Sequence, residues 1–166
     1  MRFILALVAA SAFAVSPAMA QDSGFYVGAG IGDFGIDVGG FNGSDTGFKV
    51  FGGYKFIDYL AAEVEYLDGG TVEDGGLELD VTGFNVSGVG ILPVGEKFNL
   101  FAKLGMIFWD AKASGFGNDS GEDFSWGIGA GYAFTDQFGM QLEYQGFEIE
   151  DTDTVDMISL GATWKF

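Results

Sequence analysis

Three glutamates and one lysine sit at alternate positions of otherwise apolar segments. They are Glu63, Glu65, Lys103 and Glu143. Paired carboxylates can act as general acid and general base, so a catalytic pair is one interpretation. Unpaired charges in a dry interior are costly, and the favoured interpretation is a packed polar network in which Lys103 neutralises one carboxylate. Gln141, on the same face as Glu143, is expected to belong to this network.

Other residue types that commonly perform chemistry are missing from the chain. It contains no histidine, the usual general base near neutral pH. It also contains no cysteine, which excludes disulfides, thiolate metal sites and a lipid-anchored lipoprotein. The sequence therefore predicts a protein that is not an enzyme and has no cofactor.

Two short motifs resemble ligand-binding loops and are both rejected. Gly30 to Gly35 matches GxGxxG after a predicted strand, but the following Ile36 to Gly40 cannot open the helix that a dinucleotide site needs. Residues 151–156 resemble a calcium loop, yet Asp156 stands where glycine is required and Ala162 where glutamate is required. Divalent cations could still bind crowded carboxylates less formally, although a solvated acidic surface is the favoured interpretation.

The elements that must position these residues are short segments of alternating polarity. No three-to-four periodicity is sustained, and alternation over about ten residues recurs along the chain. The eight predicted strands are Gly24 to Gly32, Gly47 to Phe56, Leu60 to Leu67, Leu79 to Pro93, Phe98 to Trp109, Asp123 to Phe134, Phe138 to Phe147, and Val155 to Phe166.

The connections between these segments alternate in length. Those after the second, fourth and sixth segments are short, such as Ile57 to Tyr59. Those after the first, third, fifth and seventh are longer, rich in glycine and aspartate, and strongly acidic. This alternation is typical of an antiparallel up-and-down meander with an even number of strands. Both chain ends then lie on the side of the short turns, so the first and last strands can pair and close a barrel.

The last segment shows which faces such a barrel would have. Ile158, Leu160 and Trp164 share one large apolar face, whereas Met157, Ser159 and Gly161 share the opposite, smaller face. A soluble sandwich would bury the large face against a second sheet. A transmembrane barrel would show it to lipid and turn the small face inward.

The same parity assigns a polar face to most segments. Its members are Glu63, Glu65, Asn85, Ser87, Lys103, Gln141, Glu143 and Ser159, together with many glycines. An eight-stranded barrel has an interior only wide enough for side chains, so these residues would fill it and satisfy one another. Aromatic residues near the short turns, such as Tyr54 and Phe138, are expected to form an interfacial girdle.

The chain begins with a predicted secretory signal peptide, residues 1–20. It has a basic start, a mainly apolar run of thirteen residues and an A-x-A ending, and such a run is too short to span a membrane. The mature domain, residues 21–166, keeps six lysines and all 24 acidic residues and has a formal charge of −18. This charge argues against nucleic-acid binding. High charge and high apolar content must therefore be segregated in space.

Several stretches carry a family resemblance. They are Phe51-Gly52-Gly53-Tyr54, Tyr59 to Glu63, Gly83 to Ser87, Gly131 to Thr135, Leu142 to Gln145 and Ser159 to Phe166. Together they resemble the eight-stranded outer-membrane barrels of the OmpA and OmpX kind over nearly the whole mature chain. The resemblance implies the outer membrane of a Gram-negative bacterium, with loops outside and turns in the periplasm. It also implies that Trp164 and Phe166 form the signal that the insertion machinery reads.

Departures from that family matter for function. Glu63, Lys103 and Glu143 look like members of its interior acid-base network, but Gln141 stands where the family has an arginine. The chain stops at Phe166, so the peptidoglycan-binding domain of many relatives is not expected. The predicted role is structural or interactive, with a plugged polar interior and acidic loops that meet lipopolysaccharide, lipid or cations. A narrow cation-preferring channel and a soluble lipocalin-like barrel are the alternatives.

Overall fold

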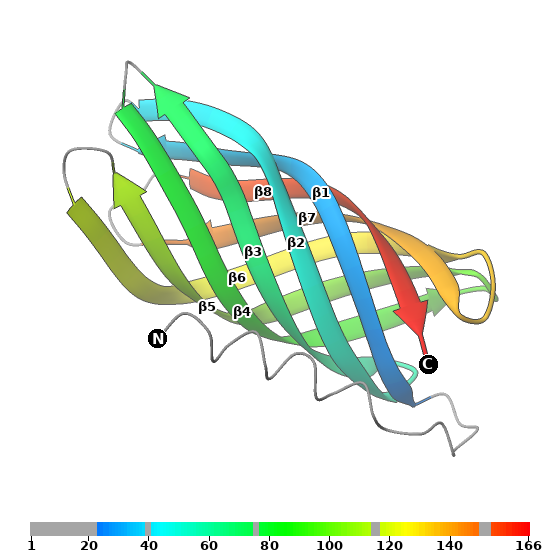
Figure 1. The fold of residues 1–166 in the computed structure, drawn as a ribbon. Coiled ribbons are helices and arrows are strands. Elements are labelled where there is room, and N and C mark those ends of the chain that lie inside the picture. The colour runs from blue at the N-terminus through cyan, green and yellow to red at the C-terminus, as the bar shows by residue number, and fades with distance from the viewer. Residues whose placement is uncertain (1–22, 39–40, 75–76, 114–116, 150–153) are drawn as a thin grey trace.

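The computed structural model describes residues 23–38, 41–74, 77–113, 117–149 and 154–166. This part of the chain forms a closed barrel of eight strands (Figure 1). The strands are β1 (Gly24–Val38), β2 (Phe41–Ile57), β3 (Leu60–Asp74), β4 (Leu77–Val94), β5 (Phe98–Ala113), β6 (Gly117–Ala133), β7 (Phe138–Glu148) and β8 (Thr154–Lys165). The described residues contain no helix that is long and apolar enough to cross a membrane.

Each strand pairs antiparallel with its neighbours in the chain, and β1 pairs with β8 to close the barrel. Closure leaves no open edge, so every strand has a hydrogen-bonding neighbour on both sides, as hydrocarbon surroundings require. We call the end with the short β2–β3, β4–β5 and β6–β7 connections the turn end, and the opposite end the hairpin end (Figure 1). The predicted all-β, up-and-down barrel is confirmed.

The strands reach further toward the hairpin end than predicted. β1 to β6 contain 15 to 18 residues, whereas about 9–11 residues suffice to cross a bilayer. The predicted long loops after the first, third and fifth segments are therefore wrong, because Asp33, Asp68 and Asp110 lie inside β1, β3 and β5. Antiparallel pairing continues through these glycine- and aspartate-rich stretches, because the ladder bonds join backbone groups, which every one of these residues has.

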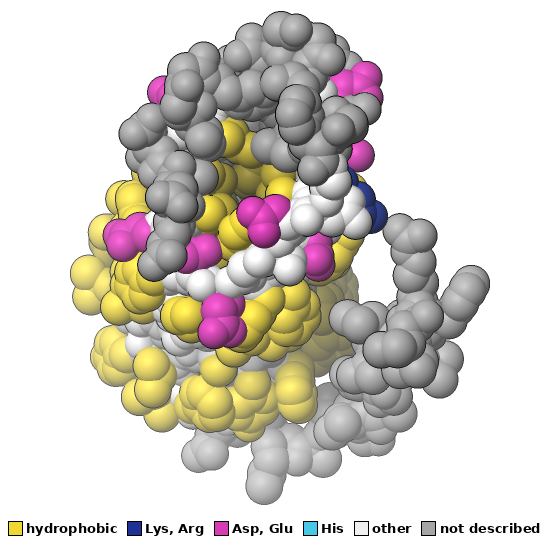
Figure 2. Space-filling view, turned by 90° about the vertical axis from the view of Figure 1, so that its left-hand side faces the viewer, with side chains coloured by type: hydrophobic (Ala, Val, Ile, Leu, Met, Phe, Trp, Pro, Cys, Tyr) yellow, Lys and Arg dark blue, Asp and Glu magenta, His cyan; other side chains and the backbone are white. Residues whose placement is uncertain are grey.

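The inward and outward faces follow the predicted parity. On β8, Leu160 is 50% exposed on the outer surface, while Met157 is 0% exposed and Ser159 is buried inside. The outer surface carries an apolar band, and acidic side chains lie at the hairpin end (Figure 2). Charge and apolar surface are thus segregated along the barrel axis.

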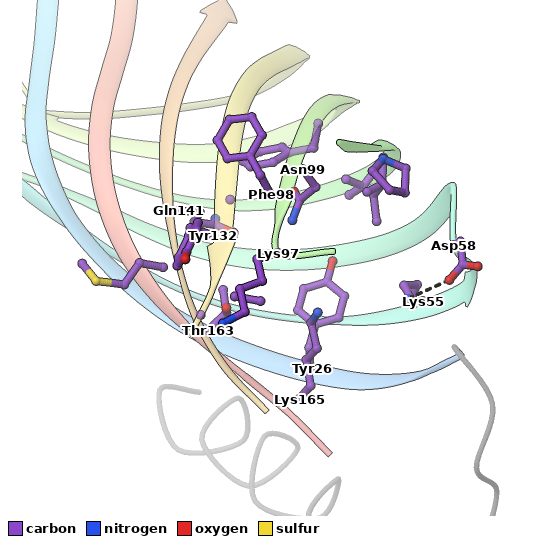
Figure 3. Close-up of a pocket in the computed structure, with 18 of the residues that line it drawn as sticks. Tyr26, Lys55, Asp58, Lys97, Phe98, Asn99, Tyr132, Gln141, Thr163 and Lys165 are labelled. Carbon is purple, nitrogen blue, oxygen red and sulfur yellow. Dashed lines mark hydrogen bonds and ion pairs between the residues drawn. The ribbon is translucent and has the colours of Figure 1, made fainter. Parts of the chain in front are cut away.

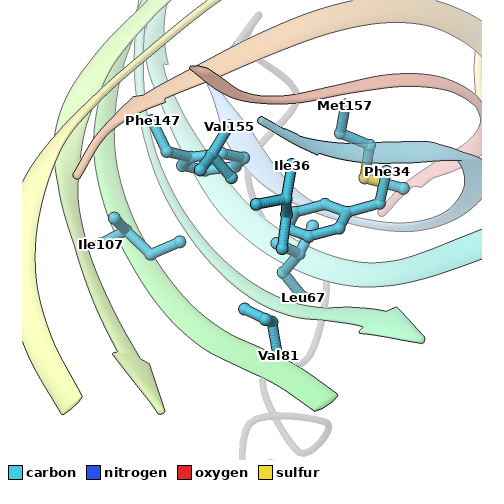
Figure 4. Packing of buried hydrophobic residues seen from close by; sticks show 8 residues of the cluster. All are labelled: Phe34, Ile36, Leu67, Val81, Ile107, Phe147, Val155 and Met157. Carbon is cyan, nitrogen blue, oxygen red and sulfur yellow. The ribbon is translucent and has the colours of Figure 1, made fainter. Parts of the chain in front are cut away.

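The lumen differs from the expected polar interior. Toward the hairpin end it contains an apolar cluster that we call the hairpin-end cluster (Figure 4). Its buried members are Phe34, Ile36, Leu67, Val81, Ile107, Phe147, Val155 and Met157. These residues have the same inward parity as the polar ones, so this half of the predicted polar interior is apolar instead.

Two aromatic rings fill the lumen nearer the turn end, and each lies over a glycine. A Cβ atom on Gly28 would lie 2.2 Å from the ring of Phe51, and one on Gly129 would lie 2.3 Å from the ring of Phe101. Real side chains never approach so closely, so both positions require glycine. The interior glycines provide the room that large inward side chains need in a narrow barrel.

Replacing Leu160 by arginine tests the outward parity. Leu160 lies midway along the outward face of β8, so the charge should cost about 2–4 kcal/mol of folding free energy in a bilayer. Thr82→Arg is the control, because Thr82 pairs with Asp68 and Asp110 near the hairpin end and should cost about 1 kcal/mol or less. Equilibrium unfolding in lipid vesicles measures both, and equal costs would contradict the assignment.

Candidate functional site: the charged lumen network

Six side chains from four strands form a charged cluster inside the barrel, which we call the lumen network. Its members are Lys49 on β2, Glu63 and Glu65 on β3, Lys103 on β5, and Glu143 and Gln145 on β7. Residues two apart on a strand share a face, so Glu63 and Glu65 both point inward, as do Glu143 and Gln145. All six are at most 4% exposed.

Lys103 holds one half of the network. Its ammonium forms an ion pair with Glu63 and lies 2.9 Å from Glu143 Oε1. The hydroxyl of Tyr26 donates a hydrogen bond of 2.8 Å to the second oxygen of Glu63. Both oxygens of Glu63 therefore have a partner.

Lys49 holds the other half. Its ammonium lies 2.6 Å from Glu143 Oε2 and 3.3 Å from Glu65 Oε2. It also donates a hydrogen bond of 2.7 Å to Gln145 Oε1, and Gln145 Nε2 donates one of 2.8 Å to Glu65 Oε1. Glu143 is thus shared between the two lysines, and it joins the halves into one network.

The charge balance of the network is uneven. Three carboxylates face two ammonium groups, so the fully ionised network carries one excess negative charge. Aromatic rings add to the stabilisation of the lysines, because the Lys103 ammonium lies 5.3 Å from the ring centre of Phe51 and 5.5 Å from that of Phe101. Every charged group has an opposite charge within reach, which is the condition for tolerating charge in a dry interior.

The structure brings together four of the five predicted network residues. Glu63, Glu65, Lys103 and Glu143 contact one another through the network, but Gln141 only reaches its edge, where it donates a 3.3 Å hydrogen bond to Glu143 and is half-buried. Sequence reasoning missed Lys49 and Gln145. Both were detectable from parity, because Lys49 alternates with the outward Phe48 and Val50 on its strand.

The arrangement supports filling and cross-linking of the lumen and gives no sign of a catalytic pair. Both oxygens of Glu63 accept hydrogen bonds, from Lys103 and from Tyr26, and Oε2 of Glu143 accepts hydrogen bonds from both lysines. Residues 30–35, which match the GxGxxG motif, lie within strand β1. In the described part of the chain no three acidic, histidine or cysteine side chains are grouped to hold a metal ion, and divalent cations at the acidic end stay a prediction. Residues 151–153 of the calcium-like motif lie outside the described residues.

The terminal aromatic residues lie at the turn end. Trp164 and Phe166 are 44% and 60% exposed on the outer surface. The Phe166 N–H donates a hydrogen bond of 3.1 Å to the Phe25 carbonyl. This position suits an interfacial aromatic girdle, and the predicted insertion signal stays a prediction.

The uneven charge balance predicts that replacing different members of the lumen network lowers the stability of the barrel by different amounts. Lys103→Met leaves three buried carboxylates against one ammonium and should destabilise the barrel by about 3–5 kcal/mol. Glu143→Gln leaves two carboxylates and two lysines, so its cost should be smaller, about 1–3 kcal/mol. Denaturant unfolding in vesicles measures both, with Gln141→Ala as a near-neutral control. A larger loss for Glu143→Gln than for Lys103→Met would contradict the charge assignment.

The chain is similar in sequence to known outer-membrane barrels. The profile of the outer membrane protein beta-barrel domain matches residues 5–166. "Outer membrane protein A" of Yersinia pseudotuberculosis is 28% identical in an alignment of 181 residues that covers 92% of this chain and 51% of that protein. The chain therefore spans about half the length of this curated relative.

Solved structures share the fold. Neisserial surface protein A covers 88% of this chain and all of its own, with a TM-score of 0.78 and 15% identity. The attachment invasion locus protein Ail of Yersinia pestis, in complex with the heparin analogue sucrose octasulfate, covers 88% of this chain and all of its own, with a TM-score of 0.65 and 18% identity. The N-terminal barrel of Pseudomonas aeruginosa OprF covers 84% of this chain and 97% of its own, with a TM-score of 0.62 and 16% identity.

These relatives are outer-membrane barrel proteins, and they place the chain in the outer membrane of a Gram-negative bacterium. The closed eight-stranded barrel, its apolar outer band and its charged lumen agree with that placement. The chain belongs to the outer membrane protein β-barrel family.

Proposed function

We propose that the protein is a non-conducting envelope protein, which spans the outer membrane as a plugged barrel and presents acidic hairpins at the cell surface. The observation that carries the proposal is the lumen network, which crosses the barrel from β2 and β3 to β7. In an eight-stranded barrel the lumen is only as wide as its side chains. Contacts from wall to wall leave no continuous path for a hydrated ion.

A second barrier supports the same proposal. The hairpin-end cluster draws buried apolar residues from β1, β3, β4, β5, β7 and β8. An ion passing this layer would lose its water without gaining polar partners, which is strongly unfavourable. The lumen is therefore blocked by an apolar layer and an ionic layer in series.

The role at the cell surface follows from the hairpin end. The β1–β2, β3–β4 and β5–β6 hairpins extend past the length needed to cross the bilayer and carry acidic residues. In outer-membrane barrels the short turns face the periplasm and the longer connections face outward. Ail was solved with a polyanion, but an acidic end repels polyanions unless cations bridge them. We therefore assign the hairpins to contact with lipopolysaccharide through bridging cations, and to direct contact with cationic surfaces.

Planar-bilayer recording tests the plug. The refolded mature chain should insert and remain silent under a salt gradient. Lys103→Met should also remain silent, because it breaks the ionic layer and leaves the hairpin-end cluster intact. Steady cation-preferring openings in the unaltered chain would favour the channel alternative. Openings in Lys103→Met alone would show that the apolar layer does not seal.

Deleting Phe166 tests the predicted insertion signal. In cells the deletion should strongly lower the amount of folded barrel in the outer membrane. Refolding of the purified chain into vesicles should change little, because Phe166 is mostly exposed. Phe56→Ala is the matched control, since Phe56 is a similarly exposed aromatic at the turn end. Normal surface levels without Phe166, or an equal loss for Phe56→Ala, would refute the assignment.

A further inference from the structure

The lumen contains a cavity of about 400 Å³ at the turn end, which we call the turn-end cavity (Figure 3). Its inner wall includes Glu63 and Lys103 of the lumen network. A neighbouring hollow beside Gly24 and Phe166 is lined by the same Lys55, Lys97 and Lys165. These three lysines therefore stand at the mouth of the cavity, on the side where β1 begins and β8 ends.

The walls of the turn-end cavity are chemically unequal. Val89, Ile91 and Phe101, from β4 and β5, form an apolar wall. Gln141 on β7 and Thr163 on β8 add polar groups to the lining of the cavity. A ligand that fits this lining has an apolar body and a polar head. The volume lies within the usual range for small-molecule sites, roughly 300–1,000 Å³.

The mouth lysines determine the charge of that head. Four lysines and three carboxylates line the cavity, and Asp136 of the neighbouring hollow brings the carboxylates to four. The charge that the head can carry therefore depends on which lysines lack a close carboxylate. Lys103 is occupied by Glu63 and Glu143, and Lys55 by Asp58 at 3.2 Å. Among the described residues, neither Lys97 nor Lys165 has a carboxylate within ion-pair distance.

Lys165 lies at the mouth together with Lys55, which repels its ammonium, and Asp136, which attracts it. Glu96 also lines the mouth and reduces its positive charge. A carboxylate bound between Lys97 and Lys165 would relieve the repulsion and would gain charge-assisted hydrogen bonds.

We propose that the turn-end cavity binds a small organic carboxylate, with its head between Lys97 and Lys165 and its apolar body against Val89, Ile91 and Phe101. The ligand enters from the side of the short turns and stops at the lumen network. This inference goes beyond the proposed function, because a blind cavity of this kind does not need the barrel to conduct.

Binding of benzoate and its neutral analogue benzamide tests the proposal. NMR titrations use the refolded mature chain in nanodiscs of zwitterionic lipid. Benzoate should bind saturably and at least about tenfold more tightly than benzamide, since hydrogen bonds to charged groups contribute about 1.5–3 kcal/mol. Methyl signals of Val89 and Ile91 should shift, whereas that of Val81 in the hairpin-end cluster should not.

Paired variants separate the mouth lysines from general charge effects. Lys97→Gln combined with Lys165→Gln should weaken benzoate binding at least about tenfold and leave benzamide binding unchanged. Lys112→Gln removes the same kind of charge from an exposed position on β5 and should change nothing. Equal binding of the two compounds, unchanged benzoate binding in the double variant, or no saturable binding would each overturn the proposal.

Discussion

The carboxylate of Glu143 is the interaction on which the interior depends. Its Oε2 accepts hydrogen bonds of 2.6 Å from Lys49 and 3.1 Å from Lys103, and the Lys103 ammonium also lies 2.9 Å from Oε1. A single side chain on β7 thus connects lysines of β5 and β2. The remaining glutamates, Glu63 and Glu65, each pair with one of these lysines. These charged side chains are at most 4% exposed. Charges so deeply buried are tolerated only when they are paired and hydrogen-bonded. The network therefore orders the centre of the lumen as a unit, and no member can be removed without affecting its partners.

The width of the barrel explains why the lumen is layered. Eight strands enclose a narrow interior, and each inward position must suit its neighbours in size and polarity. At the hairpin end these neighbours are apolar, as with Phe34 packed near Phe147 at a centroid distance of 6.4 Å. In the middle of the lumen the neighbouring side chains are charged. At the turn end, glycines lie under the rings of Phe51 and Phe101, and the lumen contains an open cavity. The barrel thus combines an apolar cluster at the hairpin end with a cavity at the turn end.

Much of this design could be predicted from the sequence because alternation has a period of two. The parity of Met157, Ser159 and Leu160 assigned lumen and lipid faces correctly, and the short turns fixed the strand count. Lys49 was missed, because the long apolar stem of lysine suits either a lumen or an interface position. The predicted strands end too early on the hairpin side, because glycine and aspartate disfavour strands. The pairing with neighbouring strands that overrides this preference cannot be read from the local sequence. The apolar layer was missed because Phe34 and Leu67 are far apart in the chain and meet only once the barrel closes.

The side-chain ammonium groups of Lys49 and Lys103 offer the most direct test of the central claim, that Glu143 joins both lysines in a water-excluded network. Nitrogen-15 NMR of the barrel in nanodiscs reports how fast the hydrogens of each ammonium exchange with water. Two slowly exchanging ammonium signals, both with contacts to the side-chain protons of Glu143, are the predicted result. Fast exchange at either lysine, or contact of Glu143 with only one of them, would contradict the shared carboxylate and the closed lumen built on it.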